Sequence, residues 1–236
     1  MDINWSNKRK YINDNDDIDE DKNKKSKKEK YDKQEDNGMN ENDNIYSYDN
    51  QVYFYSGVNT KTIIALQKEV NNTVIRMKAR YRTAQDAGLR VSYEPICVHI
   101  YSGGGSIFAA FSFIDFMTQL KHRNSEMEFH SVVEGSTASA GTLMSVVFDK
   151  RVITEYGYML IHQLSSGTWG KYADIKDDVK NMDTLMARIK MIYKMHCKVP
   201  KDKLDEILKH DIYWDAEKCL EYRLVDKIIT SSKRKL

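Results

Sequence analysis

Short apolar runs alternate with amphipathic helical patterns along most of this chain. Residues 96–101 and 129–134 have strand length and are rich in branched or aromatic side chains. Helical patterns with apolar residues three and four positions apart occupy 60–82 and 107–121. Because parallel strands require a crossover connection between them, this alternation predicts an α/β fold with a largely parallel sheet.

The remaining expected elements continue the same alternation. A sustained apolar stripe with four- and three-residue steps predicts a long helix over 172–196. A glycine-containing loop, 165–170, precedes that helix. The other expected strands are 51–57, 151–154, 158–162 and 224–229, and the other expected helices are 142–148, 201–209 and 215–222.

The N-terminal part of the chain differs sharply in charge from the rest. Residues 1–50 carry 10 Lys or Arg and 14 Asp or Glu, a net charge of −4. The remainder holds 27 of the 37 basic and 21 of the 35 acidic residues, a net charge of +6. So polar a segment cannot bury enough apolar surface to offset its chain entropy. We therefore expect residues 1–44 to be a disordered charged tail and residues 45–236 to form one folded domain.

Composition also excludes several classes of protein. Cys97, Cys197 and Cys219 lie far apart, which indicates neither a disulfide framework nor a zinc site. No apolar run approaches the roughly 20 residues of a membrane helix, and no signal-peptide pattern opens the chain. The scattered positive charge is too mild to indicate nucleic-acid binding. We expect a cytoplasmic or other soluble, reducing compartment, with no membrane or nucleic-acid partner.

Ser139 is the candidate nucleophile. It lies in Gly135-Ser136-Thr137-Ala138-Ser139-Ala140-Gly141, between an expected strand and an expected helix. Small neighbours let a substrate backbone approach, and a helix start supplies free N–H groups and a positive dipole. That environment suits acyl chemistry, in which negative charge develops on a carbonyl oxygen. The alternative is a tight Ser/Gly turn that packs a helix onto the sheet.

A glycine loop, Ser102-Gly103-Gly104-Gly105-Ser106, follows the expected strand 96–101. Loops at the carboxyl ends of parallel strands line the usual crevice of such sheets, and glycine leaves the N–H groups unobstructed. These N–H groups could donate to an oxyanion together with the N–H of Ala140. A phosphate cradle is the weaker alternative, because no GxGxxG or GxxxxGK[ST] pattern is present.

His162 and Asp211 complete the candidate site. His162 ends an apolar strand pattern and could act as general base and then general acid for Ser139. Asp211 lies between two expected helices, where a partly buried carboxylate could fix the tautomer of His162. The alternative for His162 is a structural histidine at a strand end. The alternative for Asp211 is a helix N-cap, although Asp215 is better placed for that cap.

With these motifs in this order, the chain resembles the ClpP family of caseinolytic serine peptidases from about residue 52 to residue 229. The glycine loop resembles the family's Ser-Pro-Gly-Gly-Ser, and the serine stretch resembles Gly-x-Ala-Ala-Ser-Met-Gly. Leu160-Ile161-His162-Gln163-Leu164 is similar to Met-Ile-His-Gln-Pro. His210-Asp211-Ile212-Tyr213 is similar to Arg-Asp-x-Phe, and the residues 216–226 resemble the segment that follows it in the family.

The resemblance implies a site and a fold. Ser139 would be the nucleophile, His162 the base and Asp211 the orienting acid, with the N–H groups of Gly104 and Ala140 as the oxyanion hole. The implied fold is a ClpP/crotonase-like spiral of ββα units with a long handle helix, here 172–196. The implied activity is endopeptidase cleavage of unfolded polypeptides without a metal or organic cofactor in the subunit.

The resemblance also implies an assembly. Family members form homo-oligomeric rings, as a heptamer or a double-ring tetradecamer, and receive substrate from an AAA+ unfoldase that uses ATP. This chain departs from the family pattern at Gly103 and Leu164, where the family has proline, at His210, where it has arginine, and at Arg223, where it has glycine. The charged tail stands in place of the family's axial hairpin.

Three other functions stay open on the sequence. A non-catalytic ring subunit would scaffold active partners, although such subunits usually lack the triad residues. A crotonase-like acyl-CoA enzyme shares the spiral architecture and backbone oxyanion holes, but no CoA-contacting pattern stands out. A membrane-associated signal-peptide peptidase is the least favoured, because the sequence has no anchor segment.

Overall fold

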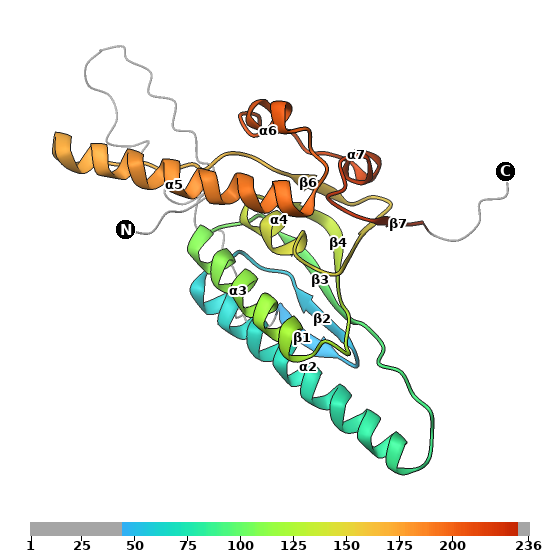
Figure 1. Cartoon of the computed structure of the whole chain (residues 1–236). Coiled ribbons are helices and arrows are strands. Elements are labelled where there is room, and N and C mark those ends of the chain that lie inside the picture. Colours follow the sequence, from blue (N-terminus) through green and yellow to red (C-terminus); the bar gives the residue numbers. More distant parts are fainter. Residues whose placement is uncertain (1–43, 231–236) are drawn as a thin grey trace, which may run out of the picture.

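A computed structural model describes residues 44–230 of the chain (Figure 1). The prediction of a disordered tail falls almost entirely outside the described residues. Within them, one sheet has the strand order β1-β2-β3-β4-β5-β7, and β6 lies alongside β4. The strands are β1 (Ile45–Tyr48), β2 (Gln51–Phe54), β3 (Ile96–Ser102), β4 (Phe129–Ala138), β5 (Lys150–Thr154), β6 (Tyr158–Leu160) and β7 (Lys227–Ile229).

The pairing directions confirm the predicted fold class. Only β1 and β2 pair antiparallel, and every other pair in the sheet is parallel. β1 was not expected as a strand, and it pairs with β2 across the short turn at residues 49–50. The chain therefore has an α/β fold in which the carboxyl ends of most strands meet at the same edge.

β4 is the branch point of the sheet. Its first half pairs with β5 through His130 to Val133, and its last residues, Ser136 to Ala138, pair with β6. The change of partner falls around Gly135, whose φ of 58° is in the left-handed region. The expected end of this strand at Glu134 was wrong, because pairing with β6 carries the strand to Ala138.

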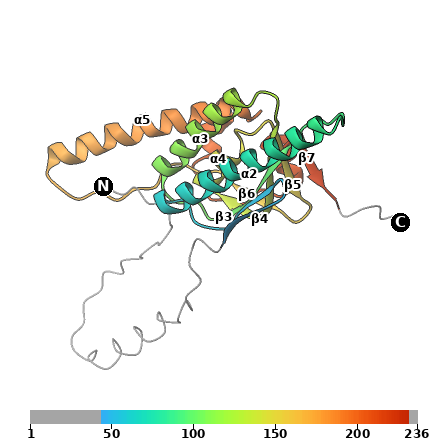
Figure 2. The ribbon, with the colours of Figure 1, turned by 90° about the horizontal axis from the view of Figure 1, so that it is seen from below.

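Two long helices cover one face of the sheet. α2 (Thr60–Asp86) and α3 (Ile107–Arg123) run side by side there (Figures 1 and 2). Their apolar stripes are buried against the strands, as the three- and four-residue spacing predicted. The shorter helices are α4 (Ala140–Ser145), α6 (Lys201–Ile207) and α7 (Ala216–Glu221). The expected cap is confirmed at α7, where the Asp215 side chain accepts from the Lys218 N–H at 2.8 Å.

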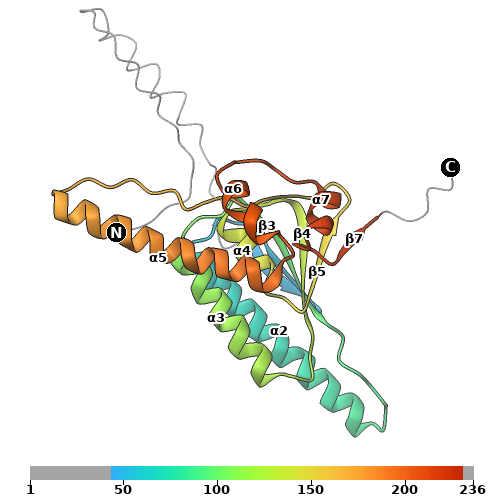
Figure 3. The same ribbon diagram turned by 45° about the horizontal axis from the view of Figure 1, so that its top comes forward.

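α5 (Tyr172–His196) matches the expected long helix at both ends. Its C-terminal part is anchored in the core by Ile189, Ile192 and Tyr193. Its N-terminal part extends away from the body of the molecule (Figures 1 and 3), and Ile175 and Val179 are exposed there. Within residues 44–230, no helix combines the length and the apolar character required to cross a membrane.

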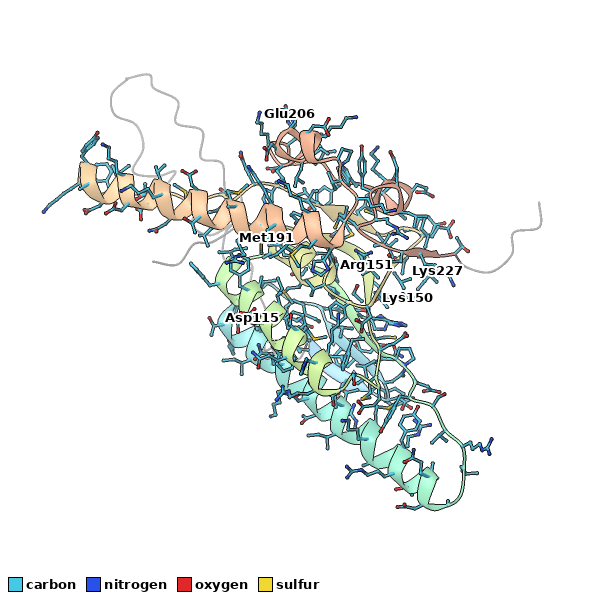
Figure 4. All side chains as sticks on the ribbon, in the orientation of Figure 1. Asp115, Lys150, Arg151, Met191, Glu206 and Lys227 are labelled. Atoms are coloured by element: carbon cyan, nitrogen blue, oxygen red, sulfur yellow. The ribbon has the colours of Figure 1, made fainter. Side chains whose placement is uncertain are left out.

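Arg151 on β5 ties the C-terminal segments to the sheet. Its guanidinium pairs with the Asp226 carboxylate at 2.6 Å and donates to the backbone carbonyls of His196 and Arg223. Figure 4 shows Arg151 near the end of α5, with its neighbour Lys150 toward the outer edge beside Lys227. One buried cation thereby connects the end of α5, the turn after α7 and the start of β7.

The Arg151–Asp226 pair predicts a pH-dependent stability. Burial alone would raise the pKa of Asp226, but hydrogen bonds and charge from Arg151 hold that pKa below its ordinary value. A lowered carboxyl pKa stabilises the fold above pH ~4, and the contribution is lost as pH falls through the folded-state value. Asp226→Asn should therefore lower the free energy of unfolding by about 1–2 kcal/mol at pH 7 and by less at pH 3.

Urea unfolding at the two pH values measures this difference. Glu221→Gln is the matched control, because the Lys218–Glu221 pair is exposed and contributes little. An Asp226→Asn deficit that stays constant down to pH 3 would show that the charge of Asp226 is not what stabilises this contact.

Candidate active site

Ser139 stands where β4 gives way to α4. Its N–H donates to the Leu160 carbonyl at 2.9 Å, which extends the β4–β6 ladder by one hydrogen bond. Its φ of 58° and ψ of −126° are sparsely populated for a residue with a side chain. Such a conformation costs about 1–3 kcal/mol and persists only where the surroundings impose it. Ser139 is 3% exposed, and its Oγ has no hydrogen-bond partner among residues 44–230.

The glycine loop lies directly against this serine. Gly104 has a φ of +89°, and a Cβ added there would lie 2.6 Å from the Ser139 Cβ and 3.1 Å from the Ala140 nitrogen. No other residue type fits without displacing the backbone. The loop is fixed from its other side, because Val58 donates its N–H to the Gly104 carbonyl at 2.8 Å. The two expected oxyanion donors, Gly104 and Ala140, are therefore brought side by side next to Ser139.

Ser102 makes a contact that the sequence reasoning missed. The Gly104 N–H donates to the Ser102 Oγ at 3.2 Å, so the expected oxyanion donor already has an acceptor in this structure. Ser102 is buried at the end of β3, opposite Thr137 of β4. A serine two residues before a glycine commonly makes such local side chain–backbone contacts, and this is the signal that would have indicated it.

His162 follows β6 at the same edge of the sheet. Since β6 is parallel to β4 and Ala138 pairs with Leu160, Ser139 and His162 both come just after the ends of neighbouring strands. The His162 side chain is 7% exposed, and its Nδ1 lies 2.8 Å from the Asp211 Oδ1. A carboxylate only accepts hydrogen bonds, so Nδ1 is the donor, and in the neutral ring Nε2 is then the basic nitrogen.

The Asp211 segment is held against β6 by hydrogen bonds at both of its ends. The Gln163 N–H donates to the Leu208 carbonyl at 2.6 Å, just before the segment. Beyond it, Met159 and Trp214 exchange two backbone hydrogen bonds of 2.9 and 2.7 Å. Because both ends are fixed to residues 159–163, the segment that contains His162, the Asp211 side chain meets the imidazole although 49 residues separate the two.

The arrangement has the parts of a nucleophilic acyl-transfer site. A strained serine, a histidine oriented by a carboxylate, and two adjacent backbone N–H groups all lie at the end of the β4–β6 ladder. Hydrogen bonds between catalytic side chains often close only when substrate binds. Among residues 44–230, no group of three or more His, Cys, Asp and Glu side chains is arranged to hold a metal ion.

Comparisons with known proteins find similarity over most of the described residues. The family model described as Clp protease matches residues 47–232. A curated relative, the ATP-dependent Clp protease proteolytic subunit of Deinococcus radiodurans, is 26% identical over 142 residues. That alignment covers 59% of this chain and 67% of the relative.

Two of the three glycines in the loop, Gly103 and Gly104, should differ in their response to alanine substitution. Gly104→Ala should lower the free energy of unfolding by about 2–4 kcal/mol, because the new Cβ meets Ser139 and φ is positive. Gly103→Ala is the matched control, since a Cβ there has no atom within 4 Å. Urea unfolding of both variants measures the contrast. Equal effects of the two substitutions would mean that the Gly104–Ser139 contact is looser than the structure indicates.

Proposed function

This chain belongs to the Clp protease family, and on that premise we propose that it is a serine endopeptidase that cleaves unfolded polypeptides. As a Clp protease it is a peptidase, a hydrolase of peptide bonds. The finer proposal assigns Ser139 as nucleophile, His162 as general base and Asp211 as orienting acid. One observation carries this assignment: the 2.8 Å contact from His162 to Asp211 lies at the end of the strand that pairs with the strand of Ser139.

The first half of the proposed reaction forms an acyl-enzyme. The Ser139 Oγ attacks the carbonyl carbon of the scissile bond while the His162 Nε2 takes the hydroxyl proton. Asp211 stabilises the resulting imidazolium through its contact with Nδ1. The negative charge moves to the carbonyl oxygen, where the N–H groups of Gly104 and Ala140 would receive it.

The second half restores the enzyme. The C–N bond breaks as His162 gives its proton to the departing amine, and the carbonyl re-forms as an ester of Ser139. A water molecule then gives a proton to His162 and attacks the ester carbon, which releases the carboxyl product and the serine hydroxyl. In both halves the oxyanion would replace the Ser102 hydroxyl as the acceptor of the Gly104 N–H. The contact between Gly104 and Ser102 would therefore form only in the absence of an oxyanion.

A non-catalytic ring subunit is the second candidate. Two observations favour it: Ser139 Oγ has no hydrogen-bond partner among the described residues, and the Gly104 N–H is engaged by Ser102. Both would also hold for a catalytic site at rest, because the hydrogen bonds of such sites often tighten only on substrate. Reactivity toward a serine-directed probe separates the two functions.

Assembly into a homo-oligomeric ring is part of the proposal. The exposed apolar residues on the N-terminal half of α5, Ile175 and Val179, would be buried between two stacked heptamers. Polypeptide substrates would reach the enclosed sites with the help of an AAA+ unfoldase, which would use the ATP. The relative from Deinococcus radiodurans is named as a subunit of an ATP-dependent protease, which supports such a partner.

A fluorophosphonate probe tests the catalytic proposal. Such a probe should label the wild-type protein, and Ser139→Ala should abolish the label. Asp211→Asn should lower peptide cleavage by about 10³–10⁴-fold, because the amide lacks the negative charge that stabilises the imidazolium and its NH2 group can hold the histidine in the wrong tautomer. Ser136→Ala, on the same strand, is the matched control and should label like the wild type. A folded, assembled wild-type protein that stays unlabelled would instead favour the non-catalytic subunit.

Native mass spectrometry tests the assembly proposal. A double ring of fourteen subunits is expected for the wild type, and Val179→Asp should convert it to single rings, because a carboxylate would be buried between the rings. Lys180→Asp, at the adjacent exposed position, is the control for the added charge. A wild-type protein that stays monomeric at micromolar concentration contradicts the ring.

A further inference from the structure

A cavity of about 380 Å³ opens between α5 and the loop that follows His162. Phe108, in the first turn of α3, forms one wall and lies four residues beyond Gly104. Ser166 forms another wall and lies four residues beyond His162. The rest of the lining comes from one stretch of α5: Asp178, Asn181, Met182, Thr184 and Leu185.

The place of this cavity indicates which part of a substrate would occupy it. In the proposed reaction the carbonyl of the residue before the scissile bond points into the oxyanion hole. The side chain of that same residue must then lie beside the glycine loop and the histidine. A cavity bounded by Phe108 and Ser166 borders both segments, and its volume accommodates a long side chain.

The lining is apolar with one charged group. Phe108, Met182 and Leu185 offer surface for an aliphatic stem. Asp178 is the single charged residue among the lining residues. Since residues 178, 182 and 185 follow the four- and three-residue steps of a helix, the carboxylate and the apolar side chains share one face of α5. The Thr168 hydroxyl donates a hydrogen bond to Asp178 Oδ2, which restricts the carboxylate from the loop side.

The charge of Asp178 has no counter-ion within residues 44–230, where no Lys, Arg or His side chain forms an ion pair with it. Its neighbour Asp177 behaves differently and pairs with Lys180 at 3.1 Å on the exposed side of the helix. A half-buried carboxylate in an apolar cavity strengthens its interaction with a cation, because the surrounding dielectric is lower than that of water. The cavity therefore complements a side chain with an apolar stem and a positive end.

We propose that this cavity selects lysine or arginine at the residue before the scissile bond, and that Asp178 is the residue that recognises the positive charge. This inference rests on the proposed peptidase function. The apolar walls contact the stem of the substrate side chain, and the Asp178 carboxylate accepts hydrogen bonds from its ammonium or guanidinium group.

Three peptides that differ only at the residue before the scissile bond test the proposal: one with lysine, one with norleucine and one with glutamate. Norleucine keeps the four-carbon stem of lysine and lacks the ammonium group. The wild-type enzyme should show a kcat/KM for lysine at least about tenfold above that for norleucine, with glutamate the poorest substrate. In Asp178→Asn the lysine-to-norleucine ratio should fall about tenfold.

Asp177→Asn is the matched control, because it removes the adjacent carboxylate on the same helix and should keep the wild-type ratio. A wild-type enzyme that cleaves after norleucine as well as after lysine overturns the inference. A ratio that is unchanged in Asp178→Asn overturns it as well, even if lysine is preferred.

The fluorophosphonate probe separates this failure from failure of the proposed function. If Ser139 is labelled and norleucine is preferred, only the inference about the cavity is wrong. If Ser139 is not labelled and none of the peptides is cleaved, the peptidase function itself is overturned, and the inference falls with it. Labelling without cleavage of any of the three peptides overturns the inference alone.

Discussion

The parallel ladder at the end of β4 is the constraint on which the rest of the site depends. β4 pairs with β3 on one side, where Ser102 meets Thr137, and with β6 on the other, where Ala138 meets Leu160. Parallel strands run out at the same edge, so the segments that follow all three strands emerge together. Those segments carry the glycine loop, Ser139 and His162. No long-range electrostatic attraction is needed to assemble them, because the backbone hydrogen bonds already do so.

Tight packing then maintains a backbone that the sequence alone would not favour. Ser139 has a positive φ, and the Gly104 backbone fills the space beside its Cβ. The strain at the serine is offset by the ladder on one side and by the glycine loop on the other. The Ser102 hydroxyl also contacts this loop, because it accepts a hydrogen bond from the Gly104 N–H, the group that an oxyanion would use. The site is therefore built at rest with one of its donors already satisfied.

Local patterns were sufficient for the elements that depend on local physics. Apolar periodicity predicted both ends of α5, and the acidic side chain before α7 predicted its cap. Local patterns did not predict where β4 ends. Gly135 and its small neighbours look like a turn, and only pairing with β6, more than 20 residues later, makes them a strand.

The order of the motifs was sufficient to identify the candidate residues. It did not predict how their side chains approach one another. The approach of Asp211 to His162 depends on backbone contacts to Leu208 and Trp214 that leave no periodic signature. Asp178 has no motif around it, and a single acidic residue in a long amphipathic helix is ordinarily a solvent-exposed charge. Arg223, noted as a replacement for glycine, proves to have a φ of +54°, a conformation that glycine adopts without strain.

The change of partner along β4 also divides the sheet into two units that can open separately. Among the described strands, β7 pairs only with β5, and the other neighbour of β5 is the first half of β4. Transient fraying of that outer edge breaks none of the hydrogen bonds between Ser136–Ala138 and β6. We therefore expect the amides of β7 to exchange with solvent through a low-energy local opening, and the amides at the end of β4 to exchange more slowly. A fluctuating outer edge and a rigid backbone at Ser139 can thus coexist in one continuous sheet.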